Sequence, residues 1–261
     1  MTSAQLYLGF RFPHHIISHV VWLYFRFLLS FRDIEELMAS RGIFVTYETI
    51  RQWTLKFGQR YANELRRRQP RRGDKWHLDE VVLTIKGKHH YLWRAVDQHG
   101  HTLDVLVQSR RNRQAAKRFF RKLLTGLCYA PRVLITDKLK SYAAAKVQIM
   151  PGVEHRQHKG LNNRAELSHQ PTRQRERQMR RFKSPGHAQR FLSAHGPINN
   201  AFRCQRNQLS AQQYRHVRTQ AFSLWNEVTD AAMNGYFTAS QYLTTAGSSR
   251  LAPGSAFDSV S

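Results

Sequence analysis

The sequence predicts an α/β protein, in which a helical N-terminal segment precedes a core of strands and helices. Apolar residues recur at helical spacing between Ile16 and Gly58, whereas three short apolar runs after Gly73 are separated by turn residues, as in an antiparallel meander. The chain of 261 residues also has 42 Lys and Arg against 17 Asp and Glu, a formal charge of +25. A charge of this size favours a polyanionic partner, above all nucleic acid.

Membrane and disulfide-based classes of protein are disfavoured by the same composition. The most apolar stretch, Ile16 to Leu29, is too short to span a bilayer and contains His19 and Arg26. The N-terminus lacks the basic segment and cleavage site of a secretory signal. Cys128 and Cys204 lie far apart and neither belongs to a C-x-x-C pair, which excludes a disulfide framework or thiolate zinc site. We therefore expect a cytoplasmic protein without a membrane partner.

The first helix of a predicted helical pair begins at a capping box formed by Ser30 and Asp33. Three apolar residues then share one face of this helix: Ile34, Leu37 and Met38. Gly42 can end the helix, because glycine readily adopts the left-handed conformation found at helix C-termini.

The second helix of the pair is expected to be capped by Thr46. Its inward face carries Ile50, Trp53 and Phe57. Polar side chains that can reach base edges and phosphates remain on the outer face: Tyr47, Arg51, Gln52 and Lys56. Two short helices joined by a glycine-containing turn have the outline of a helix-turn-helix. We therefore expect residues 1–65 to form a DNA-binding domain, with the helix-turn-helix at about residues 30–58.

A basic run separates this helical segment from the core. Residues 66–75 contain Arg-Arg-Arg-Gln-Pro-Arg-Arg followed by glycine, which indicates a linker and a domain boundary. The run is either a solvated charged segment or a linker that follows the DNA backbone. Its candidate DNA contacts are Arg66, Arg67, Arg68, Arg71 and Arg72.

Residues 76–228 are expected to form the α/β core. The predicted strands of the meander are Trp76–Ile85, His90–Asp97 and Thr102–Gln108. The elements expected next are a helix over Arg113–Leu124, a buried strand over Val133–Thr136 and a helix over Lys138–Lys146. Residues 229–261 are rich in Ser, Thr, Ala and Gly and lack periodicity, which predicts a poorly ordered tail.

Three carboxylates occupy positions that are suited to a metal site. Asp79 lies inside a predicted strand, where aspartate is depleted. Asp137 ends an apolar strand, and Glu166 falls in the first turns of a basic helical stretch that continues to Arg181. Each has an ordinary structural explanation when considered alone, such as helix capping by Asp137. Together, oxygen ligands from a first strand, a fourth strand and a later helix are what a two-metal phosphoryl-transfer site needs.

At these residues the chain resembles the DDE transposases of bacterial insertion sequences, in particular the insertion sequence six family. The stretches that carry the likeness are Gly9–Pro13, Tyr47–Trp53, Trp76–Glu80 and the run from Thr136 to Glu166. The family has an RNase H-like catalytic core. The resemblance therefore implies a mixed five-stranded sheet with flanking helices, preceded by an all-α helix-turn-helix domain.

The resemblance also implies roles for individual residues. Asp79 and Asp137 match the catalytic aspartates by position, and Glu166 matches the catalytic glutamate. These three would hold two Mg²⁺ ions, with Mn²⁺ as a substitute. Arg173, two helical turns after Glu166, matches a basic residue that holds a DNA phosphate near the metals, and Arg177 on the same basic helix is a further candidate DNA contact.

The function implied is that of a transposase that binds the terminal inverted repeats of its element, cuts one strand at each end and joins the 3′-hydroxyl to target DNA. A homodimer or larger assembly on double-stranded DNA, in the bacterial cytoplasm and nucleoid, is implied as well. Leu167, where relatives carry asparagine, and the tail depart from the family pattern, and Glu154 and Glu176 lie near Glu166. The alternatives are a non-catalytic helix-turn-helix regulator, a nuclease that cuts without joining, and an inactive relic.

Overall fold

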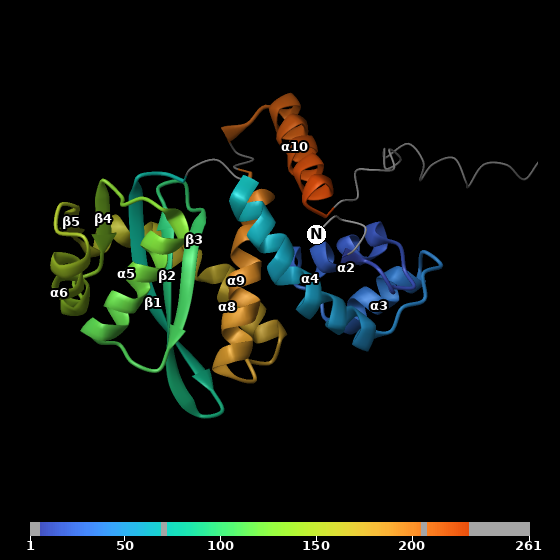
Figure 1. Cartoon of the computed structure of the whole chain (residues 1–261), viewed down its shortest axis with the longest axis horizontal. Coiled ribbons are helices and arrows are strands. Elements are labelled where there is room, and N and C mark those ends of the chain that lie inside the picture. The colour runs from blue at the N-terminus through green and yellow to red at the C-terminus, as the bar shows by residue number, and fades with distance from the viewer. Residues whose placement is uncertain (1–5, 69–71, 205–207, 230–261) are drawn as a thin grey trace, which may run out of the picture.

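The computed structural model describes residues 6–68, 72–204 and 208–229. A mixed five-stranded sheet lies at one side and the N-terminal helices at the other, with α8 (Gln170–Gln178) and α9 (Pro185–Ala201) between them (Figure 1). Arg71 and residues 230–261 of the predicted tail lie outside the described residues. In the described ranges, no helix combines the length and the apolar character needed to cross a bilayer.

The N-terminal segment forms three helices, of which the second and third begin directly after the predicted caps Ser30 and Thr46. They are α2 (His14–Arg26), α3 (Phe31–Ala39) and α4 (Tyr47–Arg68). The capping box of α3 is confirmed, since Ser30 Oγ accepts from Asp33 N (3.1 Å) and Asp33 Oδ2 accepts from Ser30 N (2.7 Å). Thr46 Oγ1 accepts from Thr49 N (3.3 Å) at the start of α4, as predicted. The helix continues through residues 66–68, so this part of the predicted linker is helical.

The inward-facing residues of the helical pair are confirmed with one exception. Ile34 and Met38 are buried on α3, as are Ile50, Trp53 and Phe57 on α4. Leu37, which was predicted on the same face of α3 as Ile34 and Met38, is 37% exposed. The apolar stripe of α3 that packs on its neighbours is narrow, and Leu37 lies at its margin.

The sheet has the strand order β3-β2-β1-β4-β5. Its strands are β1 (Lys75–Ile85), β2 (Lys88–Asp97), β3 (Thr102–Gln108), β4 (Val133–Thr136) and β5 (Glu154–Gln157). The first three pair antiparallel, which confirms the predicted meander, and β4 pairs parallel with both β1 and β5. Lys86 and Gly87 make the turn between β1 and β2, both with positive φ.

The helices of the core are placed around this sheet. These are α5 (Arg113–Leu127), α6 (Lys140–Ile149) and a series of short elements, namely a 3₁₀ turn (Lys159–Asn162), α7 (Asn163–Ser168) and α8. The last described helix, α10 (Ala211–Thr229), instead packs against α2, α4 and α9. The basic stretch predicted as one helix to Arg181 is therefore divided at His169. Pro171 lies in the first turn of α8, where the missing N–H of proline is tolerated, but it cannot continue α7.

One face of the sheet packs against α5 and α6. Trp76, Leu78 and Trp93 from β1 and β2 are buried in one hydrophobic cluster with Phe119 and Phe120 from α5. Side chains two residues apart in a strand point to the same face, so Trp76 and Leu78 anchor the part of β1 that precedes Asp79.

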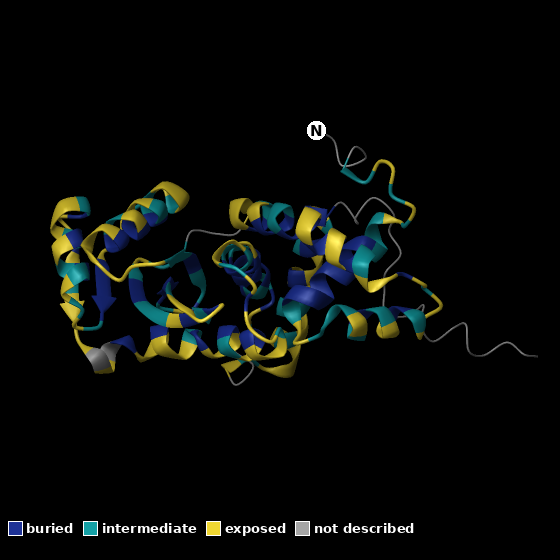
Figure 2. Ribbon diagram, turned by 90° about the horizontal axis from the view of Figure 1, so that it is seen from below, coloured by how far each residue is buried: buried dark blue, intermediate teal, exposed yellow. Residues whose placement is uncertain are grey.

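The opposite face packs against α9 and the N-terminal helices. Leu83 and Ile85, at the end of β1, belong to the same buried cluster as Phe57 of α4 and Phe191 of α9. Figure 2 shows buried residues along these facing surfaces and exposed residues on their outer sides. The helical segment and the core therefore share one hydrophobic cluster.

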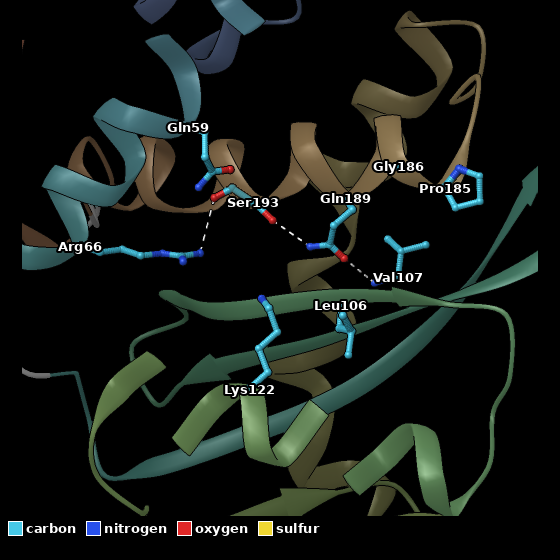
Figure 3. Close-up of a pocket in the computed structure, with 9 residues that line it drawn as sticks. All are labelled: Gln59, Arg66, Leu106, Val107, Lys122, Pro185, Gly186, Gln189 and Ser193. Carbon is cyan, nitrogen blue, oxygen red and sulfur yellow. Dashed lines mark hydrogen bonds between the residues drawn. The ribbon is translucent and has the colours of Figure 1, made fainter. Parts of the chain in front are cut away.

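Strand β3 is an edge of the sheet, and side chains from α9 satisfy its outward backbone groups. Gln189 Oε1 accepts from Val107 N (2.8 Å) (Figure 3), and Gln189 Nε2 donates to Val105 O (3.2 Å). Asn200 makes the same kind of pair with Thr102, accepting from its N (2.9 Å) and donating to its O (2.7 Å). Because unpaired edge groups are a site for unwanted strand pairing, α9 closes this edge.

Gln189→Ala should lower the free energy of unfolding by about 1–2 kcal/mol, because it leaves the Val107 N–H without its partner. Urea unfolding followed by circular dichroism measures the change. The control is Gln114→Ala, which removes an exposed amide from α5. An equal loss of stability in both variants would contradict a specific role for Gln189 at the strand edge.

The burial of His195 in α9 predicts a dependence of stability on pH. Burial, followed by the charges of Arg94, Arg175 and Arg26, lowers the pKa of His195 from 6.5 to about 3. The unfolded chain therefore binds a proton here below pH 6.5, while the folded chain does so only near pH 3. The contribution of His195 to stability should be complete above pH 6.5 and be lost as the pH falls towards 3.

Urea unfolding at about pH 7.5 and about pH 5 tests this expectation. His195→Gln should reduce the loss of stability between the two conditions, since glutamine does not titrate. His216→Gln, at an exposed position of α10, should leave that loss unchanged. Identical pH profiles for wild type and His195→Gln would refute the prediction.

Candidate active site

Three carboxylates meet where β1 and β4 diverge. Leu78 of β1 pairs with Thr136, the last residue of β4, so Asp79, Glu80 and Asp137 follow directly after the paired segment. One carboxylate oxygen from each of the three residues lies within 4.8 Å of those from the other two. The structure thus brings the predicted pair Asp79 and Asp137 together and adds Glu80 to them.

The two aspartates are held by different partners. Asp137 Oδ1 accepts from Leu139 N (3.0 Å), a turn that delays the start of α6 relative to the predicted helix. Its Oδ2 lies 3.7 Å from Arg111 Nη2. Asp79 Oδ2 lies 3.4 Å from Nε2 of His169, at the break between α7 and α8. Both carboxylates therefore face cationic or hydrogen-bonding groups.

Glu80 is the acidic residue of this cluster that the sequence analysis missed. Its side chain is only 1% exposed and accepts from Tyr142 Oη (2.7 Å) and Arg111 Nε (2.5 Å). Burial raises the pKa of Glu80 to about 7, against the opposing effects of Tyr142 and Arg111. Its position next to Asp79 was visible in the sequence, but alternation in a strand predicts that the two side chains point to opposite faces.

Glu166 lies outside the acidic cluster. Its side chain is exposed on α7, whereas Ala165 beside it is buried. Asn162, just before α7, donates from Nδ2 to Leu78 O (2.8 Å), which fixes the start of the helix next to β1. The structure therefore places the backbone of α7 beside the strand that carries Asp79, but directs Glu166 to solvent.

The neighbouring glutamates also lie outside the cluster. Glu154 is exposed on β5 and pairs with Arg156 (2.6 Å). Glu176 is buried in α8 and pairs with Arg173 (2.8 Å). Arg173 also donates to Val82 O (2.6 Å) of β1, so its guanidinium lies beside the strand of the candidate site.

The predicted DNA-contacting residues of the helix-turn-helix are all exposed: Tyr47, Arg51, Gln52 and Lys56. Arg51 pairs with Glu48 (2.6 Å), and the Lys56 ammonium lies 4.4 Å from the Phe10 ring centroid. Arg177 is exposed on α8.

The arginines of the predicted basic linker differ in their ion-pair partners and in their burial. Arg66 pairs with the buried Asp104 (3.3 Å), Arg67 with Glu64 (2.8 Å) and Arg68 with Glu227 (3.8 Å), and all three arginines are exposed. Arg72 is half-buried, and burial lowers its pKa. Arg66 therefore contacts the core directly.

The cluster of Asp79, Glu80 and Asp137 fits a divalent cation by its donor set. Carboxylate oxygens are the hard ligands that Mg²⁺ and Mn²⁺ prefer, and histidine or cysteine would favour softer metals. Three carboxylates this close together also repel one another unless a cation lies near them. In the described structure Arg111 provides such a charge.

Comparison with known proteins assigns the family. A sequence model described as a DDE domain matches residues 73–205, just over half of the chain and the part that carries the sheet and the acidic cluster. The chain belongs to the DDE transposases of the insertion sequence six family. This RNase H-like transposase thus has the five-stranded mixed sheet that the resemblance implied, and a DDE domain implies the use of a divalent metal.

Curated relatives agree with this assignment. The transposase is 31% identical over 164 residues to the "Transposase for insertion sequence-like element IS431mec" of Staphylococcus aureus, covering 61% of this chain and 73% of the relative. The same values hold for the "Transposase for insertion sequence element IS257 in transposon Tn4003" from that species. An uncharacterized protein of Yersinia pseudotuberculosis is 38% identical over 77 residues, covering 29% of this chain and 72% of that protein.

Proposed function

We propose that this transposase binds the terminal inverted repeats of its insertion sequence and cuts and joins DNA strands, with Asp79, Asp137 and Glu166 as catalytic carboxylates. The observation that carries the proposal is the convergence of Asp79 and Asp137 from β1 and the end of β4. Two carboxylates that meet where neighbouring strands separate can together supply oxygen ligands to the metal ions used in phosphoryl transfer.

The proposed metal is Mg²⁺, as two ions, with Mn²⁺ as a substitute. Bound ions would activate the attacking oxygen and stabilise the leaving oxygen of an in-line displacement. Asp79 and Asp137 would hold the cations, and Tyr142 and Arg111 keep Glu80 oriented at the same cluster. Glu166 would be the third carboxylate of the set, which requires its exposed side chain to turn towards Asp79. No nucleophilic side chain is needed, because water and then the DNA 3′-hydroxyl attack the phosphate.

The DNA contacts are proposed on two surfaces. The outer face of the helix-turn-helix contacts the terminal repeats, because Arg51, Gln52 and Lys56 are exposed on α4. The arginines of the linker and of α8 follow the backbone of double-stranded DNA. Joining two element ends to one target requires two active sites, so the working unit is at least a homodimer on DNA.

A non-catalytic regulator is the second candidate. One observation favours it, namely the ion pairs of Arg111 with Glu80 (2.5 Å) and Asp137 (3.7 Å), which neutralise the acidic cluster without a metal. In a regulator these carboxylates would be structural, and DNA binding alone would be the activity.

The purified chain should be incubated with Mg²⁺ or Mn²⁺ and DNA that carries the repeats flanking its own gene. Intact ends report strand cleavage, and precut ends report strand transfer. We expect both products in metal and neither in EDTA. Binding of the repeats without cleavage or joining would establish the regulator instead, and cleavage without joining would identify a nuclease.

A further inference from the structure

A large basic cavity lies next to the acidic cluster but does not include it. Its volume is about 900 Å³, and it is bounded by the sheet, α7, α8 and α9. Its cationic lining residues are Arg26, Lys75, Arg94, Arg156, Arg164 and Arg203. No Asp or Glu is among the described residues that line it.

The alternation of β1 creates this cavity. Val81, Leu83 and Ile85 occupy one face of the strand and pack with the shared hydrophobic cluster. Continuing along the same face in steps of two residues leads to Asp79 and then to His77 and Lys75. The face is therefore apolar where α9 and the N-terminal helices cover it, and polar where the cavity remains.

Arg94 is the strongest indication of what the cavity binds. Its side chain is 4% exposed and lies opposite Asp79 in the β1–β2 ladder, yet it makes no ion pair with any residue in the described ranges. It donates only to neutral oxygens, Ser168 O (2.5 Å) and Thr172 Oγ1, and its Nε has no partner among the described residues. Burial lowers the pKa of Arg94 to about 10, so it stays charged at neutral pH.

A buried guanidinium without an anionic partner is unfavourable, because desolvation of the charge is not offset by a counter-charge. The other cations of the cavity do not relieve this cost. Arg26 donates to Asn199 Oδ1 (2.8 Å) and Arg203 to Gly100 O (2.6 Å), while Arg156 alone among the lining cations has a described carboxylate partner, Glu154. An anion that entered the cavity would meet several unneutralised donors at once.

We propose that this cavity is a second binding site of the transposase, which takes a phosphate-bearing ligand on Arg94, Arg164 and Arg203. Arginine suits phosphate because its planar fork donates two parallel charge-assisted hydrogen bonds. The volume lies within the range of about 300–1,000 Å³ that is usual for small-ligand sites. The phosphate belongs either to the backbone of a DNA strand or to a free nucleotide or phosphate ion. The site does not depend on the proposed catalytic role of the carboxylates.

Binding to the full-length chain should be measured in EDTA, so that neither metal binding nor cleavage contributes. The probes are inorganic phosphate, dAMP and a fluorescein-labelled single-stranded oligodeoxynucleotide. Arg94→Gln should weaken binding of the phosphate-bearing probe by about tenfold or more, as expected for the loss of charge-assisted hydrogen bonds. Arg164→Ala combined with Arg203→Ala should have a similar effect, and it decides the question if Arg94→Gln does not fold.

The control variant must remove as many positive charges as the cavity double variant, but outside the cavity. A chain of charge +25 binds DNA non-specifically, so loss of charge alone could weaken binding. Arg118→Ala combined with Arg121→Ala removes two exposed arginines from α5, on the other side of the sheet, and should change binding by no more than about twofold. Weakened binding of the oligonucleotide alone would support the site and assign it to a DNA strand.

Weakened binding of dAMP or phosphate alone would support a site for a free anion, and weakened binding of all three would support a phosphate site open to both sources. The proposal is overturned if the folded cavity variants bind all three probes as the α5 control does.

Discussion

Asp137→Asn should abolish most strand cleavage and strand transfer while the protein remains folded. The variant keeps the side-chain oxygen that accepts from Leu139 N but removes the charge that faces the acidic cluster. A bound divalent ion contributes several kcal/mol of transition-state stabilisation, and about 1.4 kcal/mol corresponds to a factor of ten in rate. We therefore expect a loss of roughly 10²- to 10⁴-fold, measured as the rate of joining precut ends in Mg²⁺.

The matched control is Asp74→Asn, which neutralises an exposed aspartate that pairs with Arg132 just before β1. It should retain the wild-type rate within about threefold, an effect well under 1 kcal/mol. Full strand-transfer activity of Asp137→Asn would refute the catalytic role of Asp137 in the acidic cluster.

The same assay separates the two candidates for the third carboxylate. Glu166→Gln removes the residue that the family likeness assigns, and Glu80→Gln removes the residue that the structure places beside the aspartates. If Glu166 turns into the site, Glu166→Gln should be as damaging as Asp137→Asn. If Glu166→Gln is active and Glu80→Gln is not, Glu80 is the third ligand.

Arg175→Leu should lower the free energy of unfolding by about 3–5 kcal/mol, because it leaves several buried carbonyl groups without donors. Arg175 is 1% exposed in α8 and donates to Tyr24 O (2.8 Å), Phe27 O (3.1 Å) and Leu29 O (2.8 Å). These groups lie at and just after the C-terminal turn of α2, where helix carbonyls lack partners within the helix and where a cation is favoured.

The guanidinium of Arg175 also lies 4.4 Å from the ring centroid of Tyr24 and 5.4 Å from that of Phe191, which adds cation–π attraction. Urea unfolding followed by tryptophan fluorescence measures the loss of stability. Arg177→Leu, two positions later on an exposed site of the same helix, should change stability by no more than about 0.5 kcal/mol. Equal effects of the two variants would show that Arg175 has no special structural role.

Local patterns were sufficient for most of the fold. The meander and the strand Val133–Thr136 were predicted at nearly the observed boundaries, because strand alternation and turn residues act over a few neighbouring positions. The position of strand β5 was not predicted, because Glu154–Gln157 contains no apolar residue. The segment is recognised as a strand by its pairing with β4. The division of the basic helix at His169 was missed for a related reason, because helix periodicity alone was followed past Pro171.

The candidate site was only partly predictable. Asp79 and Asp137 were singled out because a carboxylate inside or at the end of an apolar strand is unusual in any fold. The role of Glu166 stays a prediction, because its side chain is exposed on α7 and lies outside the acidic cluster. Where that side chain points depends on how α7 packs against β1, which the sequence alone does not indicate. Glu80 was missed because it lies beside Asp137 only in the folded chain. The pairing of β1 with β4 ends at Leu78 and Thr136, and the residues that follow on both segments then come together.

By itself, the sequence determined the order of the elements from α3 to α6, the caps of α3 and α4, the basic character of the chain and the family to which it belongs. All of these depend on residue type and on spacing along the chain. Only the tertiary structure decided which carboxylates meet, that Arg175 caps α2, and that Arg94 is buried in a basic cavity without a counter-charge. Those contacts join residues far apart in the sequence, and the packing of helices on the sheet, which no local pattern encodes, brings them together.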